Sequence, residues 1–356
     1  MQNKIISLTK KFVAIKSIDG NKKELDEILK LAVSQLKEYT IEHFKKNGIK
    51  STLVYNTKTR PKKFKIILNV HLDVIPGKEN QYKAKVKENK LFGVGAMDMK
   101  ANAACMIYVF KKIAKELDYP IALQLTTDEE TGGFNGTQHQ IKEGVRGDFV
   151  ITSEPTNFDI VYQAKGILWL KVYAKGITAH GAYPWRGENA VLKIHKFVTD
   201  LQKKYPNPKN EKWVTTINVS KIETKNIVFN KIPDDCEVWL DIRYIPKDSK
   251  TIVQNIKKLL PKECKMEIIE KEPSLMTDKN DFYIKKLKNI TTKVIGKKTI
   301  LRGAQGSSDA RHYANINCPG IEFGPIGGGI GSDAEWVDIP SLEKYCEIIT
   351  SFLKKI

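Results

Sequence analysis

The sequence "FKIILNVHLDV" (residues 64–74) contains an apolar run that ends in a histidine and an aspartate. Its first seven residues have the length and the β-branched content of a buried strand. Two similar runs follow, "IALQLTT" (121–127) and "DFVITSE" (148–154), and an alanine-rich helical pattern (98–117) separates the first two. This alternation of strands and helices predicts an α/β fold with a mostly parallel sheet flanked by helices.

Acidic and imidazole side chains follow each of these strands at the point where the strand ends. Ligands of open α/β sheets bind at this carboxyl edge. A further aspartate stands at the start of the helix between the first two strands. The six side chains expected at this edge are His71, Asp73, Asp98, Glu129, Glu130 and Glu154.

Five carboxylates cannot share one crevice as anions, because like charges raise each other's pKa and burial adds to the cost. A bound cation removes this conflict. Imidazole and carboxylate ligands suit zinc, with manganese, cobalt or iron as weaker candidates. A bridging carboxylate would also allow two ions about 3.5 to 4 Å apart. The sequence therefore predicts a metal site, although a helix cap or a surface acid explains each residue taken singly.

The pattern changes at about Gly166, where four strands and two helices follow in the order strand, helix, strand, strand, helix, strand. This is the ferredoxin-like order. The earlier pattern resumes after about residue 272. We therefore predict a compact domain, residues 166–271, inserted into an α/β domain made of residues 1–165 and 272–356.

The composition is that of a soluble globular protein, with 41% hydrophobic and 28% charged residues. No apolar run approaches the ~18 residues that span a bilayer, which excludes a membrane protein. The net charge of +19 comes from lysines spread over most helices, so we expect solvated helix faces and no nucleic-acid partner. Five scattered cysteines and an N-terminus without an export signal predict a cytoplasmic protein with reduced thiols.

A series of motifs along nearly the whole chain resembles a known family. The motifs are "HLDVIPG", "LFGVGAMDMKA", "TTDEETGG", "TSEPT", "KGITAHGAYPWRGENA", "NKIPDD", "LDIRYIP", "GSSDARHYA" and "EFGP" with "EWVDI". In this order they are similar to the dinuclear zinc aminoacylase and carboxypeptidase superfamily, which includes succinyl-diaminopimelate desuccinylase, acetylornithine deacetylase and glutamate carboxypeptidase. The resemblance implies a zinc-peptidase-like catalytic domain with the inserted domain as lid and dimerisation domain.

The resemblance also implies roles at the metal edge. His71, Asp98 and Glu154 would hold one zinc ion, and Asp98 would bridge to a second ion that Glu130 also holds. Asp73 would orient His71 and raise its basicity. Glu129 would be the general base, which takes a proton from the attacking water and returns it to the leaving amine.

In the inserted domain, the resemblance implies that His180 reaches an active site, usually that of the neighbouring subunit, and stabilises the oxyanion of the tetrahedral intermediate. A surface loop histidine is the alternative. Tyr183 and Asn230 stand where the family's lid touches substrate. Arg243 matches a position that pairs with a substrate carboxylate, a task that suits a guanidinium, although a strand-end salt bridge would also explain it.

A predicted helix start in "GAQGSSDARHYA" carries Ser307, Ser308 and Asp309. Backbone N–H groups and hydroxyls at such a position can hold an anionic group of the substrate, and helix capping is the alternative for either serine. Arg311 matches the family, whereas His312 occupies a place often held by an aromatic residue.

One residue of the family's metal site is absent. In the family, the glycine-rich segment ends in a histidine four residues before the acidic position that matches Glu335, and that histidine completes the second metal site. Here the position is Gly331, and no histidine follows His312. Three interpretations stay open: a weak second site completed by Asp333, Ser332 or His312, a catalytically weakened binding relative, or an engineered or aberrant change in an otherwise complete enzyme.

Because the predicted base, lid histidine and arginine are all present, we favour an enzyme. We expect a cytoplasmic, homodimeric hydrolase with one or two zinc ions, or with cobalt or manganese instead. It would cleave the amide bond of an N-acyl amino acid, as desuccinylases and deacetylases do. Carboxypeptidase or dipeptidase action on a short carboxylate-bearing peptide is the alternative.

Overall fold

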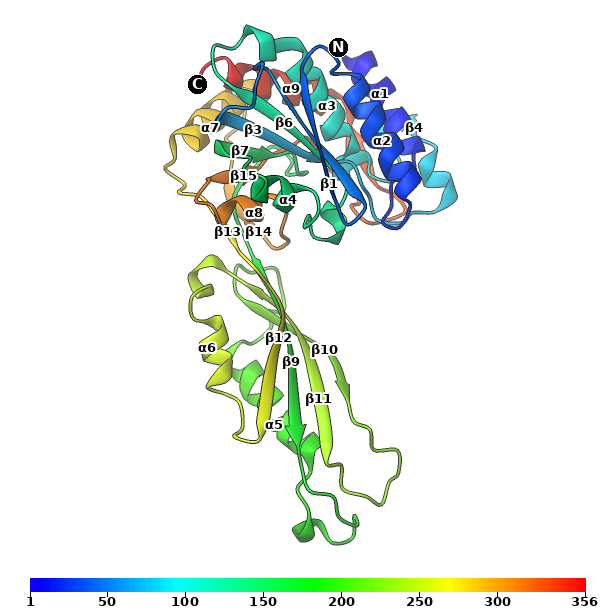
Figure 1. Cartoon of the computed structure of the whole chain (residues 1–356), viewed down its shortest axis with the longest axis vertical. Coiled ribbons are helices and arrows are strands. Elements are labelled where there is room, and N and C mark those ends of the chain that lie inside the picture. Colours follow the sequence, from blue (N-terminus) through cyan, green and yellow to red (C-terminus); the bar gives the residue numbers. More distant parts are fainter. The chain divides into compact units, whose positions relative to one another are not determined.

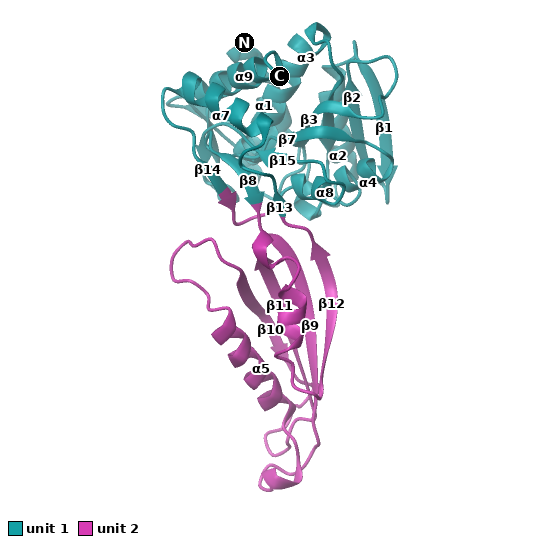
Figure 2. Ribbon diagram, turned by 90° about the vertical axis from the view of Figure 1, so that its left-hand side faces the viewer, with its two compact units in different colours: residues 1–163, 275–302, 308–356 teal, residues 164–274, 303–307 magenta.

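A computed structural model describes all 356 residues of the chain. The chain divides into two compact units, which Figure 1 shows by sequence and Figure 2 by unit. The first unit comprises residues 1–163, 275–302 and 308–356, and the second comprises residues 164–274 and 303–307. The first unit is therefore built from both ends of the chain.

A nine-stranded sheet forms the centre of the first unit. Its four middle strands are parallel neighbours, in the order β6 (Ile121–Thr126), β3 (Phe64–His71), β7 (Gly147–Thr152) and β15 (Gly320–Glu322). They confirm the predicted parallel sheet. The outer strands are β1 (Thr40–Lys46), β2 (Ile49–Tyr55), β8 (Ile160–Ala164), β13 (Leu275–Met276) and β14 (Leu301–Ala304).

The strands β1 and β2 form an antiparallel hairpin that the sequence analysis did not predict. Lys46 pairs with Ile49, so Asn47 and Gly48 make a two-residue turn. Both turn residues have positive φ, and Asn-Gly is the sequence that such a turn favours. The signal was therefore present in the sequence.

Helices cover both faces of this sheet (Figure 1). Along β3, Ile66, Leu68 and Val70 pack into one hydrophobic core, whereas Ile67 packs into a second core on the opposite face. This two-sided burial explains the continuous apolar run. The first face is covered by α1 (Gln2–Ala14), α2 (Lys22–Ser34), α3 (Ala101–Ile113), α7 (Phe282–Ile295) and α9 (Ile339–Leu353), and the second by α4 (Thr137–Lys142) and α8 (Ala310–Ala314).

A smaller sheet in the first unit holds the glycine-rich segment in place. Its strand order is β16 (Gly327–Gly328), β17 (Trp336–Asp338), β5 (Lys90–Phe92) and β4 (Lys85–Lys87). The N–H of Gly93 also donates to the carbonyl of Glu335 at 3.2 Å. The glycine-rich segment therefore lies beside the residues that lead to Asp98.

The second unit has the element order β9 (Gly166–Lys175), α5 (Ala190–Lys204), β10 (Thr216–Glu223), β11 (Asp235–Tyr244), α6 (Ile252–Lys257) and β12 (Cys264–Glu272). The strands form one antiparallel sheet in the order β10, β11, β9, β12. Alternate side chains of β9 and β11 are buried and pack with both helices in a separate core. Because the burial alternates along the strands, the opposite sheet face is free of helices.

Candidate metal centre

The predicted acidic and imidazole side chains stand at the carboxyl edge of the parallel strands. His71 is the last residue of β3, and Glu154 follows the end of β7. The short 3-10 turn η4 (Glu129–Thr131) follows β6 and carries the two predicted glutamates. Asp98 lies in the segment directly before α3. Four separate chain segments thus meet at one edge of the sheet.

Three of these side chains form a single cluster. The Nε2 atom of His71 lies 3.1 Å from Oδ1 of Asp98 and 4.0 Å from Oε1 of Glu154, and the three ligand atoms all lie within 4.8 Å of one another. The Oε1 atom of Glu154 is buried and has no hydrogen-bond partner. One imidazole and two carboxylates are a donor set that suits zinc, so these residues fit a bound metal ion.

Asp73 supports both His71 and the turn η4. The Nδ1 atom of His71 lies 3.1 Å from the carbonyl oxygen of Asp73 and 3.6 Å from its Oδ1 atom. We therefore assign the imidazole proton to Nδ1, which leaves the Nε2 lone pair facing the cluster. The Oδ2 atom of Asp73 accepts a hydrogen bond from the N–H of Glu130 at 2.9 Å. Asp73 thus contacts the Nδ1 edge of His71 and the turn η4 at the same time.

The centre gathers several partly buried carboxylates around His71. Burial raises the pKa of Glu130 to about 7 and also raises the pKa of Glu129 and of Glu154. For His71, burial pulls the pKa down, but hydrogen bonds with Asp73 and Asp98 outweigh that effect and raise the pKa. A divalent cation among these groups would favour their ionised forms.

Gly331 lines a cavity together with Glu335, whose carboxylate accepts a hydrogen bond from the backbone N–H of Asp98. Ile75 and Lys78 also contribute to the lining of this cavity. The backbone φ of Gly331 is +70°, in the left-handed region, and a Cβ atom there would meet only Cδ1 of Ile75, at 3.4 Å. The position therefore has room for a side chain, but the backbone conformation favours glycine.

The three residues considered as substitutes at the second metal site are engaged elsewhere. The hydroxyl of Ser332 donates to the carbonyl of Gly329 at 2.8 Å. Asp333 forms an exposed ion pair with Lys78. His312 is fully buried and faces the carbonyl of Gly132. None of the three joins a cluster with Asp98 and Glu130.

Glu335 and Glu322 are two buried glutamates to which the sequence analysis gave no role. Glu335 accepts hydrogen bonds from the N–H groups of Gly95, at 3.0 Å, and of Met97, at 2.8 Å. It therefore holds the segment that leads to Asp98. Glu322 is the last residue of β15, which pairs in parallel with β7. A residue at the end of a parallel strand is expected at the carboxyl edge of the sheet, where the metal centre also lies.

At the predicted helix start, the side chains of Ser308 and Asp309 form hydrogen bonds with other residues of the chain. The hydroxyl of Ser308 donates to Oε1 of Glu322 at 2.6 Å. Asp309 accepts hydrogen bonds from Thr126 and Thr137. These two residues therefore serve the fold, whereas the buried hydroxyl oxygen of Ser307, in the second unit, has no hydrogen-bond partner.

The second unit places its predicted substrate contacts in two groups. His180, Tyr183 and Asn230 are exposed and lie together: the rings of His180 and Tyr183 are 5.6 Å apart, and the N–H of Gly181 donates to the carbonyl of Asn230 at 2.7 Å. Arg243 lies apart from them, near the end of β11, where its Nε atom donates to Asp241 at 2.9 Å. The salt bridge considered for Arg243 is thus present, and the side chain is still partly exposed.

Comparison with known proteins gives sequence and structural matches along the chain. Residues 67–355 match the model of Peptidase family M20/M25/M40. A succinyl-diaminopimelate desuccinylase of Buchnera aphidicola subsp. Cinara cedri is 30% identical over 387 aligned residues, which cover 100% of both chains.

Two solved structures show the same fold. An aminopeptidase from Bacillus cereus has a TM-score of 0.82 at 18% identity and covers 99% of this chain and 98% of its own. A dinuclear metal-binding peptidase from Bacillus subtilis has a TM-score of 0.74 at 14% identity, with 99% and 97% coverage. These likenesses confirm the predicted zinc-peptidase-like fold class.

Proposed function

Because this chain belongs to Peptidase family M20/M25/M40, it is a hydrolase of amide bonds, and we propose that it cleaves N-acyl amino acids. The observation that carries this proposal is the cluster of His71, Asp98 and Glu154 with the partly buried Glu129 beside it. The desuccinylase relative that matches the full chain supports N-acyl amino acids, and among them N-succinyl substrates. The net charge of +19 suits anionic substrates of this kind.

The family depends on metal ions, and we propose zinc, with cobalt or manganese as alternatives. His71, Asp98 and Glu154 would hold the first ion. Asp98 and Glu130 would hold a second ion more weakly, because Gly331 contributes no ligand. When bound, such an ion polarises the scissile carbonyl and favours deprotonation of water.

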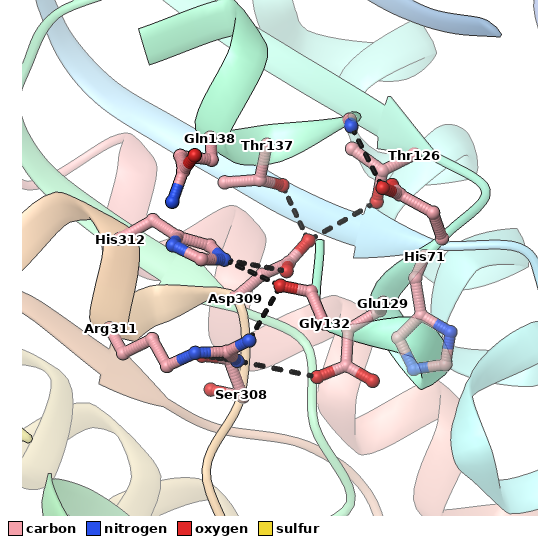
Figure 3. Close-up of polar contacts among 12 residues, drawn as sticks. His71, Thr126, Glu129, Gly132, Thr137, Gln138, Ser308, Asp309, Arg311 and His312 are labelled. Carbon is pink, nitrogen blue, oxygen red and sulfur yellow. Dashed lines mark hydrogen bonds and ion pairs between the residues drawn. The ribbon is translucent and has the colours of Figure 1, made fainter. Parts of the chain in front are cut away.

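The chain's own residues would move the proton and balance the charge. We assign the general base to Glu129, which lies beside His71 at the strand edge (Figure 3). Burial raises its pKa, which suits a group that takes a proton from water and then returns it to the leaving amine. Asp73 keeps His71 in the orientation and tautomer that a ligand needs.

We also propose that the first unit is the catalytic domain and the second a lid that completes the site of a partner subunit. In the second unit, Asp235 pairs with Lys175 and Arg243 pairs with Ile167, eight positions along β11. At the rise of a strand this separation is about 26 Å, and His180 lies beyond the Lys175 end. One small substrate cannot touch both His180 and Arg243 of the same lid. A homodimer in which two lids contribute to each site resolves this conflict.

Exposed apolar side chains support a partner at this end of the lid. Ile227 and Phe229 are almost fully exposed, and they stand three positions and one position before Asn230. Contiguous exposed apolar side chains often mark interaction sites. A second copy of this chain would cover them in the proposed homodimer.

A cytoplasmic location is also part of this proposal. All five cysteines are free and most are buried, as expected in a reducing compartment. The structure contains no helix with the length and apolar character needed to cross a bilayer.

Metal content and substrate hydrolysis together test the proposed function. We expect elemental analysis of the purified chain to find at least about one zinc ion per chain, and we expect hydrolysis of N-succinyl or N-acetyl amino acids ahead of dipeptides. A chelator should abolish the activity, and added zinc should restore it. The proposal would be contradicted if the purified chain held less than about one metal ion and cleaved none of these substrates, and if the Gly331→His variant were inactive as well.

A further inference from the structure

The backbone carbonyl of Gly132 is held by two neighbouring side chains of α8 (Figure 3). The Nη2 atom of Arg311 donates to this oxygen at 2.6 Å, and the Nε2 atom of His312 lies 2.9 Å from it. Both side chains are almost completely buried. Nε2 of His312 must carry the proton to donate, so both acceptor positions of one carbonyl oxygen are filled by protein donors.

This carbonyl belongs to the residue that closes the turn η4. The N–H of Gly132 donates to the carbonyl of Glu129 at 2.8 Å, and Gly132 has a φ of +107°. A single 3-10 turn has few hydrogen bonds of its own. Its orientation, and with it the direction of Glu129 and Glu130, therefore depends on contacts with other segments.

The helix that provides these contacts is itself anchored to the sheet and to α4. Asp309 precedes α8 and accepts hydrogen bonds from Thr126 of β6, at 3.3 Å, and from Thr137 of α4, at 2.5 Å. Arg311 and His312 therefore extend from a fixed support toward Gly132. In addition, the Nη1 atom of Arg311 lies 4.0 Å from Oε1 of Glu129.

We propose that Arg311 and His312 are positioning residues that hold Glu129 and Glu130 in place through the Gly132 carbonyl; we call this pair the Gly132 clamp. The inference rests on the proposed role of Glu129 as general base. Neither clamp residue needs to touch substrate. A displacement of about 1 Å of a catalytic group can cost on the order of a hundredfold in rate, so a small shift of η4 would be sufficient to reduce turnover.

Two matched variants of His312 separate the hydrogen bond from side-chain volume. His312→Phe keeps a ring that can pack against Phe134, whose ring centroid lies 5.9 Å from that of His312, but it removes the donor. His312→Gln keeps an N–H donor. We expect kcat to fall about tenfold in His312→Phe, with KM changed by less than about twofold, whereas His312→Gln keeps most of the activity.

Arg311→Lys tests the other half of the clamp, because lysine keeps the charge near Glu129 but loses the guanidinium fork. We expect a loss of about tenfold in kcat here as well. Since both donors act on one carbonyl, the effects on kcat in the double variant should not be independent. Independent effects in the double variant would count against a shared action on Gly132.

Hydrogen exchange of the backbone amides in residues 128–134 provides a readout that needs no substrate. We expect faster exchange of the Gly132 amide in His312→Phe than in the wild type and in His312→Gln, with unchanged exchange in β3 and β7. Wild-type kcat and exchange in His312→Phe, or equal losses in the Phe and Gln variants, would overturn the proposal. If the wild-type chain cleaves no substrate but the exchange responds as expected, the clamp is supported and the proposed function fails.

Discussion

The carboxylate of Glu335 accepts a hydrogen bond from the backbone N–H of Asp98 at 3.0 Å. The two residues are 237 positions apart in the sequence. Burial raises the pKa of Glu335, and the backbone donors of Asp98 and Met97 oppose this shift. One side chain of the glycine-rich segment thus fixes the backbone that presents a metal ligand.

We expect Glu335→Gln to destabilise the protein and weaken its metal site. An amide has one acceptor oxygen, and its NH₂ group would face a backbone N–H. The loss should be about 2 kcal/mol in the free energy of unfolding, measured by denaturant unfolding with a chelator present. Metal titration should show weaker binding, because Asp98 loses its support.

Asp333→Asn is the matched control for this prediction. It changes a nearby carboxylate whose ion pair with Lys78 is exposed, so the expected change is below about 1 kcal/mol. Equal stability of the Glu335→Gln and Asp333→Asn variants would show that the buried hydrogen bonds do not hold the segment.

The two glutamates of η4 should give different defects. Glu129→Gln is expected to lower kcat by about 10² to 10⁴-fold with unchanged metal content, because it removes only the proposed base. Glu130→Gln should instead lower the amount of metal bound per chain. Elemental analysis and steady-state kinetics on the same preparations distinguish the two. Loss of metal in Glu129→Gln would mean that Glu129 is a ligand and not the base.

That His71, Asp98 and Glu154 meet at one edge of the sheet could be predicted from the sequence, because each residue stands near the end or start of a regular element. Parallel strands place their carboxyl ends at one edge, so no knowledge of side-chain packing was needed. The same rule applies to Glu322, which ends the parallel strand β15. The grouping of His71, Asp98 and Glu154 as ligands of one ion was implied only by the family resemblance.

The supporting contacts could not be predicted in this way. Glu335 reaches Asp98, and Arg311 reaches Gly132 across 179 positions. Such contacts depend on how loops pack against each other, and no periodic pattern in the sequence predicts that packing. For the same reason the sequence did not indicate that the hydroxyl of Ser308 donates a hydrogen bond to Glu322.

Gly331→His is expected to raise the metal content of the chain. The nearest atom to a new Cβ is Cδ1 of Ile75, so the side chain has room, although the left-handed backbone should cost about 1 kcal/mol. Elemental analysis should show more metal per chain than in the wild type. Gly331→Gln is the control, since it has a similar volume without an imidazole. The same metal content in both variants would mean that residue 331 does not reach the second site.

Glu322 should make the protein less stable as the pH rises. Burial raises its pKa from 4.5 to about 7 in the folded protein, although the Ser308 hydroxyl opposes the shift. Below pH 4.5 both states are protonated. Between that pH and about 7 the unfolded chain loses the proton while the folded chain keeps it, so stability falls as the pH rises through this window.

Glu322→Gln should remove this contribution, because the amide oxygen can still accept the Ser308 hydrogen bond but does not titrate. The free energy of unfolding of both proteins is measured near about pH 5 and about pH 8. All other groups titrate in both, so the difference between the two slopes belongs to Glu322. We expect the wild type to lose on the order of 3 kcal/mol more than the variant over this range. Parallel pH profiles would show that folding does not raise the pKa of Glu322.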